Sequence, residues 1–563
     1  MTARRELAVL AAVWLGLHLP FLNQAFVIDE GHFVDQTLQI VRAPTAPYSF
    51  AIRLAKPWSA YEYLANPPGI GYFLAPVVAT LGPGETGLHL ACMLFSGLAL
   101  LAIWLLAREV VGAGLYPALL VACFPAFLLS SHTVMPDVPA AAFATLSIFL
   151  LFRGDKARPA VLAWAGAAAG AAALFKYSAL FVIGLLVLYP LLRGGRRRLD
   201  LLPVASAVAV FAVWCALSFL WYGEVHLASA LARESEPRPL GRLGIQALAV
   251  LLGLGGATLL PPLLVIVGSA RSFRISRVAG LAAIAWAGVS VPLAFVDWGL
   301  PRFEYDPVNR LIGGLMLAAG GTFFIVVLAQ GTSSAFGLWQ RRAEPDSRRR
   351  HARWLLLVVW ALGFLLADGL LLFASPKYLV PALAPLTLLL LGGGGEPAVT
   401  WPRGSRTLAL GATCFLALGL SLNAGAQSAH SRRYVLETVV ELADGVETWF
   451  TGQWSVRYYA ERAGHRYLPG RLTEKTIPEE GDLIFDVLDA VRHPVPEPLR
   501  AHLRVVDEAS LPAPFPIQHS NPLVKAGYWA HTTGFLPYVW TREPVSVIRT
   551  YRFGPGRGQG ADR

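Results

Sequence analysis

The segment "FVIDEGHFVDQ" carries the most chemically informative residues of this 563-residue chain, because two adjacent carboxylates, Asp29 and Glu30, follow an apolar run from Leu7 to Ile28. A charge held in hydrocarbon costs about 2.5 to 3.5 kcal/mol on insertion scales, so an acid at the end of such a run normally faces water, a partner or a cavity. A carboxylate in that place can accept a proton from a hydroxyl or an amine. From spacing alone, capping of a following helix by its anionic side chains is the simpler interpretation.

Further charged residues stand at the ends of other apolar runs. Asp137 lies between two prolines in "SSHTVMPDVPAAAF", and Lys176 and Lys377 each precede a tyrosine, in "LFKYSAL" and "SPKYLVPAL". Arg302 lies in "DWGLPRFEYDP". Each lysine taken singly is explained as an interface anchor with an apolar stem. Together, these cations and carboxylates suit a phosphate leaving group beside an acceptor that must lose a proton.

The composition identifies the elements that must position these residues. The chain is 55% hydrophobic and only 15% charged, which is typical of a membrane protein. Apolar runs of about 18 residues or more are long enough to cross a bilayer. Thirteen such runs are predicted, near 7–28, 87–107, 111–131, 135–152, 159–175, 178–193, 201–222, 243–268, 277–296, 309–329, 353–373, 378–394 and 405–424. Several are rich in Ala and Gly, as in "AWAGAAAGAAALF", which favours close helix packing.

The loops between these runs predict the orientation. Lys and Arg cluster in alternate loops such as "RGGRRRLD" and "QRRAEPDSRRRHAR", which should be cytoplasmic. This placement explains the net charge of +11 without any nucleic-acid partner. The amino terminus is then cytoplasmic and the acidic loops face outward. The first run lacks a clear small-x-small cleavage site, so we interpret it as a span rather than a signal peptide.

Two outward segments are longer than turns. Residues 29–86 form a long first loop, in which "WSAYEYLANPPGIGYF" contains interfacial aromatic residues and a bend at two prolines. Residues 425–553 change pattern: "GDLIFDVL", "HLRVVDE" and "VSVIRTYRF" predict strands, and "RRYVLETVVELADGV" predicts an amphipathic helix. A transmembrane domain over 1–424, a small α/β domain over 425–553 and a disordered tail over 554–563 result. The stretch "GYWAHTTGFLPYVW" of the α/β domain could shape an acceptor groove or form the core of that domain, and we favour core.

Cofactor signals are weak. The four cysteines all lie in apolar runs and form no disulfide framework or zinc spacing. No P-loop or dinucleotide fingerprint occurs in the sequence. A divalent ion could be held by oxygen-rich and imidazole side chains, although no spacing enforces such a site. The residues in question are Asp29, Glu30, His32, His132 and Asp137.

Several motifs, in order along the chain, resemble the protein O-mannosyltransferase-like bacterial membrane glycosyltransferases. They are "DEGHFVDQ", "NPPGIGYFLAP", "MPDVPAAAFATLSIFLLFR", "GAAAGAAALFKYSALFVIGLLVLYPLL" and "SPKYLVPALAPL". This superfamily has the GT-C fold and includes the aminoarabinose transferase of lipid A. The resemblance implies a mainly α, polytopic GT-C bundle of about thirteen spans with a small extracytoplasmic α/β domain. It also implies transfer of a sugar from a polyprenyl-phosphate carrier to an envelope glycan, lipid or protein.

The resemblance also implies roles for single residues. Asp29 matches the general base, and Glu30 would assist in orientation or hold a cation. Lys176, Lys377 and Arg302 are expected to hold the donor phosphate. Residues expected to contact the acceptor or support the site are Asp137, His32, Asn66 and Tyr378. Asn66 stands in "NPPG" where many relatives carry a charged residue, which weakens the case for metal or phosphate binding there.

The resulting hypothesis is a glycosyltransferase of the bacterial inner membrane that acts at the outer face. The rival is a transporter or flippase of a lipid-linked sugar, since charged residues inside the membrane also mark substrate pathways. The inverted repeats typical of many transporters are not evident in the sequence. A third alternative, an outer binding module on a helical anchor, leaves Asp29 and Lys176 unexplained.

Overall fold

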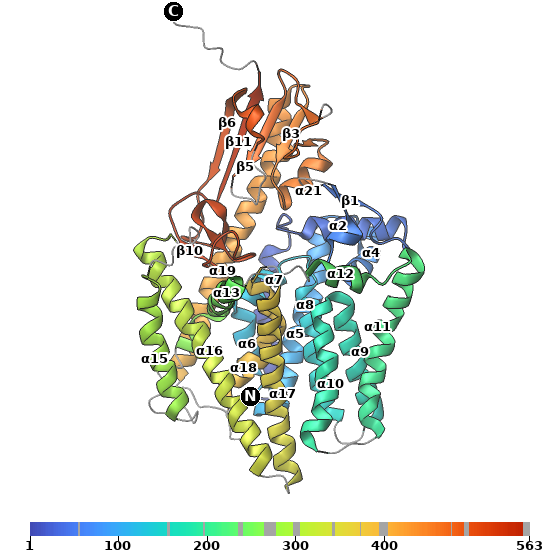
Figure 1. Cartoon of the computed structure of the whole chain (residues 1–563), viewed down its shortest axis with the longest axis vertical. Helices are drawn as coiled ribbons and strands as arrows, with labels where there is room; N and C mark the ends of the chain where they lie inside the picture. The colour runs from blue at the N-terminus through green and yellow to red at the C-terminus, as the bar shows by residue number, and fades with distance from the viewer. Residues whose placement is uncertain are drawn as a thin grey trace, which may run out of the picture.

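The computed structural model is a bundle of helices with an α/β unit at one end (Figure 1). We call that end the outer end. The residues described are 1–53, 57–154, 158–194, 198–234, 240–263, 277–296, 304–340, 344–371, 373–392, 403–473, 476–488 and 495–554.

The first half of the chain forms a continuous series of helices and turns. Its helices are α1 (Ala3–His18), α2 (Glu30–Arg42), α3 (Ala60–Tyr63), α4 (Gly69–Leu81), α5 (Glu85–Val111), α6 (Leu115–Cys123), α7 (Pro125–Ser131), α8 (Asp137–Gly154), α9 (Pro159–Phe175), α10 (Leu180–Arg193) and α11 (Leu201–Tyr222). A short hairpin of β1 (Ala51–Arg53) and β2 (Pro57–Ser59) precedes α3.

The described helices of the second half of the bundle are longer on average. They are α12 (His226–Glu234), α13 (Leu240–Thr258), α15 (Arg277–Leu293), α16 (Pro307–Gln340), α17 (Pro345–Leu370), α18 (Leu383–Leu391) and α19 (Arg403–Arg433). A 3₁₀ segment, η5 (Pro376–Ala382), connects α17 to α18 because Pro376 and Pro381 interrupt regular helix.

The chain is a multi-pass membrane protein by the length and apolarity of its helices. Within the described residues, six helices are long and apolar enough to cross a bilayer: α5, α8, α11, α16, α17 and α19. Six shorter apolar helical stretches accompany them. The predicted run 111–131 is divided into α6 and α7, since Pro125 begins a new helix. The first predicted run extends to residue 28, but α1 already ends at His18.

Small residues bring the helices of the first half into close contact. A methyl group added at Gly166 of α9 would lie 1.9 Å from the carbonyl oxygen of Pro203 in α11. One added at Gly69, the first residue of α4, would lie 2.3 Å from the carbonyl oxygen of Leu174 in α9. These approaches confirm the close packing that the Ala- and Gly-rich runs predict.

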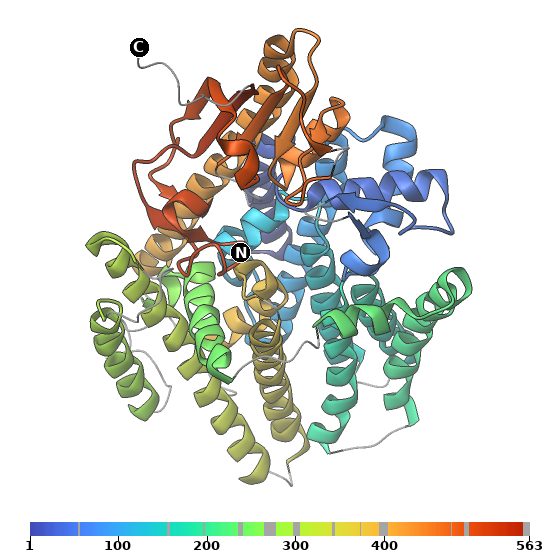
Figure 2. The same ribbon diagram turned by 45° about the horizontal axis from the view of Figure 1, so that its top comes forward.

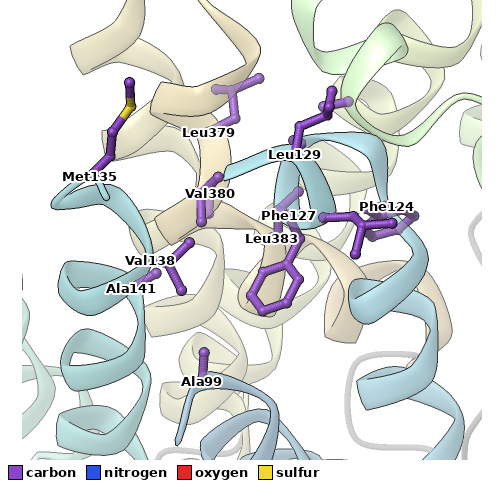
Figure 3. Close-up of a cluster of buried hydrophobic side chains, with 14 of the residues drawn as sticks. Ala99, Phe124, Phe127, Leu129, Met135, Val138, Ala141, Leu379, Val380 and Leu383 are labelled. Atoms are coloured by element: carbon purple, nitrogen blue, oxygen red, sulfur yellow. The ribbon is translucent and has the colours of Figure 1, made fainter. Parts of the chain in front are cut away.

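A buried apolar cluster lies where α7, α8 and η5 meet (Figure 3). Phe127 of α7 and Val138 of α8 are turned toward Val380 and Leu383, at the junction of η5 and α18. All four side chains are buried. This cluster fixes the start of α8 and the start of η5, the two places that carry Asp137 and Lys377.

The α/β unit follows α19, which continues into a π-helical turn and α20 (Val439–Ala443). Its five-stranded sheet has the order β4-β3-β5-β11-β6. β3 is parallel to β4 and β5, and β11 is antiparallel to β5 and β6. The bounds are β3 (Thr448–Thr451), β4 (Arg466–Tyr467), β5 (Leu483–Val487), β6 (Leu503–Leu511) and β11 (Ser546–Phe553). The predicted fold class, a helical membrane bundle with a small carboxyl-terminal α/β part, is confirmed.

The α/β unit rests on the outer end of the bundle beside α2 (Figures 1 and 2). The stretch "GYWAHTTGFLPYVW" makes part of this contact, because the Ser375 hydroxyl donates to the Tyr528 carbonyl at 3.0 Å. The Ala374 amide donates to His531 Nδ1 at 2.9 Å. This stretch is largely buried, as the preferred interpretation as core requires, and it also packs against the outer end of the bundle.

Candidate active site

Asp29 directly precedes the first residue of α2 and follows a residue with an unusual backbone conformation. The preceding residue, Ile28, has φ +50, which is rare and costly for a β-branched side chain. Asp29 is the N-cap residue of α2, where the helix dipole favours an anion, but its side chain makes no capping hydrogen bond within the described residues. Its Oδ2 lies 3.6 Å from Lys377 Nζ at the start of η5. The Asp29 side chain is 36% exposed and that of Lys377 only 8%.

Glu30 has a different environment from its neighbour. It is fully buried and accepts hydrogen bonds from the backbone amides of Val27 and Val134, the latter at 2.5 Å. His89 of α5 lies on the same carboxylate, with Nε2 3.0 Å from Oε1. Glu30 therefore ties the Asp29 loop to α5 and to the turn before α8, while Asp29 remains accessible to solvent.

Asp137 and Lys176 form a second, buried ion pair. Asp137 opens α8 and Lys176 follows α9, so the pair joins two helix ends. The aromatic ring of Tyr378 lies close to both ammonium groups, with its centre 4.3 Å from Lys176 Nζ and 5.4 Å from Lys377 Nζ. Such cation–π contacts hold both lysines against one aromatic ring. The structure thus brings together five of the residues predicted from the sequence: Asp29, Lys377, Tyr378, Lys176 and Asp137.

Asp368 is a further acid that the sequence analysis missed. It lies near the end of α17, is buried, and accepts the Ser375 amide at 3.1 Å through Oδ1. It also acts electrostatically on Lys176. The signal was present in the sequence, because an acid inside the apolar run "ALGFLLADGLLLF" is costly and seldom kept without a role.

His32 and Asp35, one turn further along α2, contact the α/β unit. Arg457, in α21 (Ser455–Arg462), donates from Nη2 to His32 Nδ1 at 2.9 Å and to Asp35 Oδ2 at 3.0 Å. Burial, together with the charge of Arg457, lowers the pKa of His32 well below its usual value. His32 also lies edge-on to the ring of Tyr63. Burial and the charge of Asp29 raise the pKa of Tyr63 to about 12, so this phenol stays protonated.

The remaining predicted residues lie elsewhere. Asn66 occupies the turn before α4, where its backbone carbonyl accepts the Tyr48 hydroxyl at 2.7 Å. His132 stacks on Phe21, and its Nε2 bonds to the Leu17 carbonyl at 3.0 Å. Arg302 falls outside the described residues. In the described part of the chain, no group of three or more His, Cys, Asp or Glu side chains could hold a metal ion.

Two apolar grooves lie between helices of the bundle. One, of about 520 Å³, is lined by α13, α16 and α17 and includes Ala247, Gly369 and Leu370. It reaches the residues that directly follow Asp368. The other, of about 480 Å³, lies between α10 and α11 and includes Leu180 and Gly184.

Comparison with solved structures found similar chains at low identity. ArnT from Cupriavidus metallidurans, bound to undecaprenyl phosphate, is 16% identical, with 90% of this chain and 97% of that chain covered and a TM-score of 0.45. An oligosaccharyltransferase from Archaeoglobus fulgidus is 15% identical, with 82% and 64% covered and a TM-score of 0.47. The mycobacterial arabinofuranosyltransferase AftD is 15% identical, with 99% and 40% covered and a TM-score of 0.39.

Sequence comparison gives a family match to part of the chain. No curated protein matches the sequence. The family model of the dolichyl-phosphate-mannose-protein mannosyltransferases matches residues 65–222, less than a third of the chain. This stretch runs from just before α4 to the end of α11 and contains Asn66, Asp137 and Lys176. Over residues 65–222 the chain therefore resembles the dolichyl-phosphate-mannose-protein mannosyltransferases, and the resemblance drawn from the sequence motifs is confirmed there.

Proposed function

We propose that this protein is a membrane glycosyltransferase that moves a sugar from a polyprenyl-phosphate donor to an acceptor at the outer end of the bundle. The pair formed by Asp29 and Lys377, with 3.6 Å between Oδ2 and Nζ, is the observation that carries the proposal. A base and a cation at that separation serve the two ends of a glycosyl transfer, deprotonation of the acceptor and stabilisation of the leaving phosphate.

The reaction proceeds as a displacement at the anomeric carbon. Asp29 takes the proton of the acceptor hydroxyl or amine. At the same time, the oxygen or nitrogen of the acceptor forms the new bond to the anomeric carbon. The bond between the anomeric carbon and the phosphate oxygen breaks, and polyprenyl phosphate leaves with the electron pair. Lys377 turns from Asp29 to the phosphate, which frees the carboxylate to act as the base. Attack from the face opposite the phosphate inverts the configuration.

The carrier needs an apolar path to this site. The groove between α13, α16 and α17 is the better of the two for the isoprenoid tail, because Gly369 and Leu370 directly follow Asp368. Lys176 and Lys377 then face the phosphate where the groove ends, each with its ammonium group near the ring of Tyr378. Arg302 is an additional proposed phosphate ligand. His32, Asn66 and Asp137 are proposed to support the acceptor side or the neighbouring loops.

We further propose an inner-membrane location with the amino terminus in the cytoplasm. α8 begins with Asp137 and carries Arg153 in its last turn, and α10 likewise ends with Arg193. The acids of the site and these arginines therefore lie at opposite ends of the bundle, as the positive-inside rule requires. The bundle is assigned to residues 1–424, the periplasmic α/β domain to 425–553 and the tail to 554–563.

Reconstitution tests the proposed function against transport. The purified full chain is placed in liposomes with polyprenyl-phosphate hexoses or pentoses and an extract of envelope glycans, lipids and proteins. Mass spectrometry then follows two products, the glycosylated acceptor and free polyprenyl phosphate. Glycosyl transfer requires both to appear together. Movement of intact donor across the bilayer, with neither product formed, would establish the transporter alternative.

A further inference from the structure

Helix α21 of the α/β unit contacts residues that precede Asp29 in the sequence and residues that follow it. Upstream, the Phe26 amide donates to the hydroxyl of Tyr459 at 2.9 Å. Downstream, Arg457 bonds to His32 and Asp35 of α2. Between these contacts, a methyl group added at Gly31 would lie 2.9 Å from Cβ of Tyr458. Three consecutive residues of α21 therefore contact the stretch from Phe26 to Asp35, which we call the acid loop.

Arg457 is the central element of this contact. Its side chain is 2% exposed, although a guanidinium keeps its charge when buried. Besides His32 and Asp35, its Nη1 lies 3.7 Å from Glu461 Oε2. Both bonds to α2 come from Nη2, while Nη1 faces Glu461 of the same helix α21. One buried guanidinium thus links the start of α2 to α21.

The α/β unit also contacts Lys377, the partner of Asp29. Lys377 Nζ lies 5.7 Å from the ring centre of Trp529. The neighbouring residues of that loop bond to the turn before η5, through Tyr528 to Ser375 and through His531 to Ala374. One face of the unit therefore contacts both the acid loop and the turn that carries Lys377.

We infer that Arg457 is a positioning residue, and that α21 sets the placement of Asp29 against Lys377 for the transfer reaction. This inference rests on the proposed function. Glu30 fixes the acid loop from the bundle side and Arg457 fixes it from the outer side. Without Arg457 the first turn of α2 loses its outer support, and Asp29 moves relative to Lys377 and the acceptor.

Kinetics of Arg457→Gln test the inference. A displacement of about 1 Å lowers turnover by about 100-fold, so kcat should fall by this order while KM for the lipid donor stays close to wild type. Arg457→Lys keeps the charge and should restore part of kcat. Arg462→Gln is the matched control, since Arg462 lies on the same helix and pairs with the same Asp35 at 3.1 Å, but is partly exposed. Its kcat should stay close to wild type.

His32→Phe provides a test if Arg457→Gln does not fold. This change removes one acceptor of Arg457 and leaves its contacts with Asp35 and Glu461, so the chain should fold and lose kcat at an unchanged KM for the donor. A folded His32→Phe or Arg457→Gln chain with wild-type kcat would overturn the inference.

A second readout does not depend on transfer. The variant Asp29→Cys is labelled with a hydrophilic maleimide, and the chain that keeps Asp29 gives the background of the four native thiols. Arg457→Gln should raise the labelling rate several-fold, and Arg462→Gln should leave it unchanged. Equal rates in all backgrounds would contradict the inference. Absence of sugar transfer by the wild-type chain would instead overturn the proposed function and leave the labelling result standing.

Discussion

At the residue scale, each carboxylate of the site has a separate partner and thereby a separate task. Asp29 is partly exposed beside Lys377, Glu30 is buried under backbone amides and His89, and Asp137 is paired with Lys176. The adjacent acids in "DEGH" therefore do not share one cation. Glu30 is best explained as the residue that fixes the loop, and Asp29 as the residue left available for chemistry.

Asp137→Asn tests the buried pair. Removing Asp137 leaves the buried Lys176 charge without its hydrogen-bonded partner, and breaking a buried ion pair in this way costs about 3 to 5 kcal/mol. We expect the unfolding free energy in detergent, followed by tryptophan fluorescence in denaturant, to fall by this amount.

A double variant, Asp137→Leu with Lys176→Met, is the control. It removes both charges and should recover most of the loss, because an apolar pair replaces the buried ion pair. Wild-type stability of the single variant would contradict the assigned pairing.

Much of the site could be predicted at this scale, and the reason is electrostatic. Asp29, Asp137, Lys176 and Lys377 stand at the ends of apolar runs, where a charge needs a reason. Arg457 was missed because it lies in a polar stretch of the α/β unit, where an arginine is expected to be exposed to solvent. Only the docking of α21 on α2 makes it a buried partner of His32.

At the element scale, the predicted spans show where helices lie but not how they pack. Several predicted spans match helices within a few residues, as 159–175 and 201–222 match α9 and α11. Hydropathy along the sequence was enough to predict these two helices. It did not reveal that Pro125 divides 111–131, or that the loop 29–86 contains the apolar helix α4, because hydropathy alone does not report how a segment packs.

Gly69→Ala tests the contact between α4 and α9. The new methyl group would meet the Leu174 carbonyl at 2.3 Å, and a backbone atom cannot move aside like a flexible side chain. Overpacking of this kind costs about 1 to 3 kcal/mol, which we expect as a lower melting temperature in detergent.

Gly84→Ala is the matched control, since a methyl group there meets no atom of the described chain within 4 Å. Equal melting temperatures for the two alanine variants would show that α4 does not approach α9 as described.

The contact between α2 and α21 should depend on pH through His32. The folded-state pKa of His32 lies well below 6.5, so this contribution to stability is present above pH 6.5 and is lost as the pH falls. The charged or titratable groups around it are Arg457, Asp35, Tyr63 and Glu461.

His32→Asn isolates this effect, because the amide oxygen can accept from Arg457 but does not titrate. We expect the melting temperature of the wild type to fall more than that of His32→Asn between pH 7 and pH 5. Parallel profiles would remove His32 from the pH dependence.

At the scale of the whole molecule, the site lies where three parts meet: the outer ends of the helices, the acid loop and the α/β unit (Figure 2). The sequence predicted the parts and their order. It did not show how the α/β unit rests on the bundle, because the contact combines backbone atoms, such as the Tyr528 carbonyl, with pairs of side chains far apart in the sequence, such as Arg457 and Asp35.

The assignment of the carrier groove is also a prediction at this scale. Ala247→Trp places a bulky ring in the groove between α13, α16 and α17. We expect KM for a long-chain polyprenyl-phosphate donor to rise several-fold, and KM for a short-chain analogue to change little.

Gly184→Trp fills the groove between α10 and α11 and serves as the control. The reverse result, with Gly184→Trp raising KM and Ala247→Trp silent, would place the tail in that second groove.

Turnover of Asp29→Asn in liposomes tests the central claim most directly. The amide keeps the shape of the side chain but cannot accept the proton, and a general base contributes about 10² to 10⁴ in rate. We predict at least a hundredfold loss of kcat with unchanged melting temperature. Glu62→Gln, which changes an exposed acid of the first outer loop, should keep wild-type turnover. An Asp29→Asn chain that transfers sugar at the wild-type rate would contradict the account.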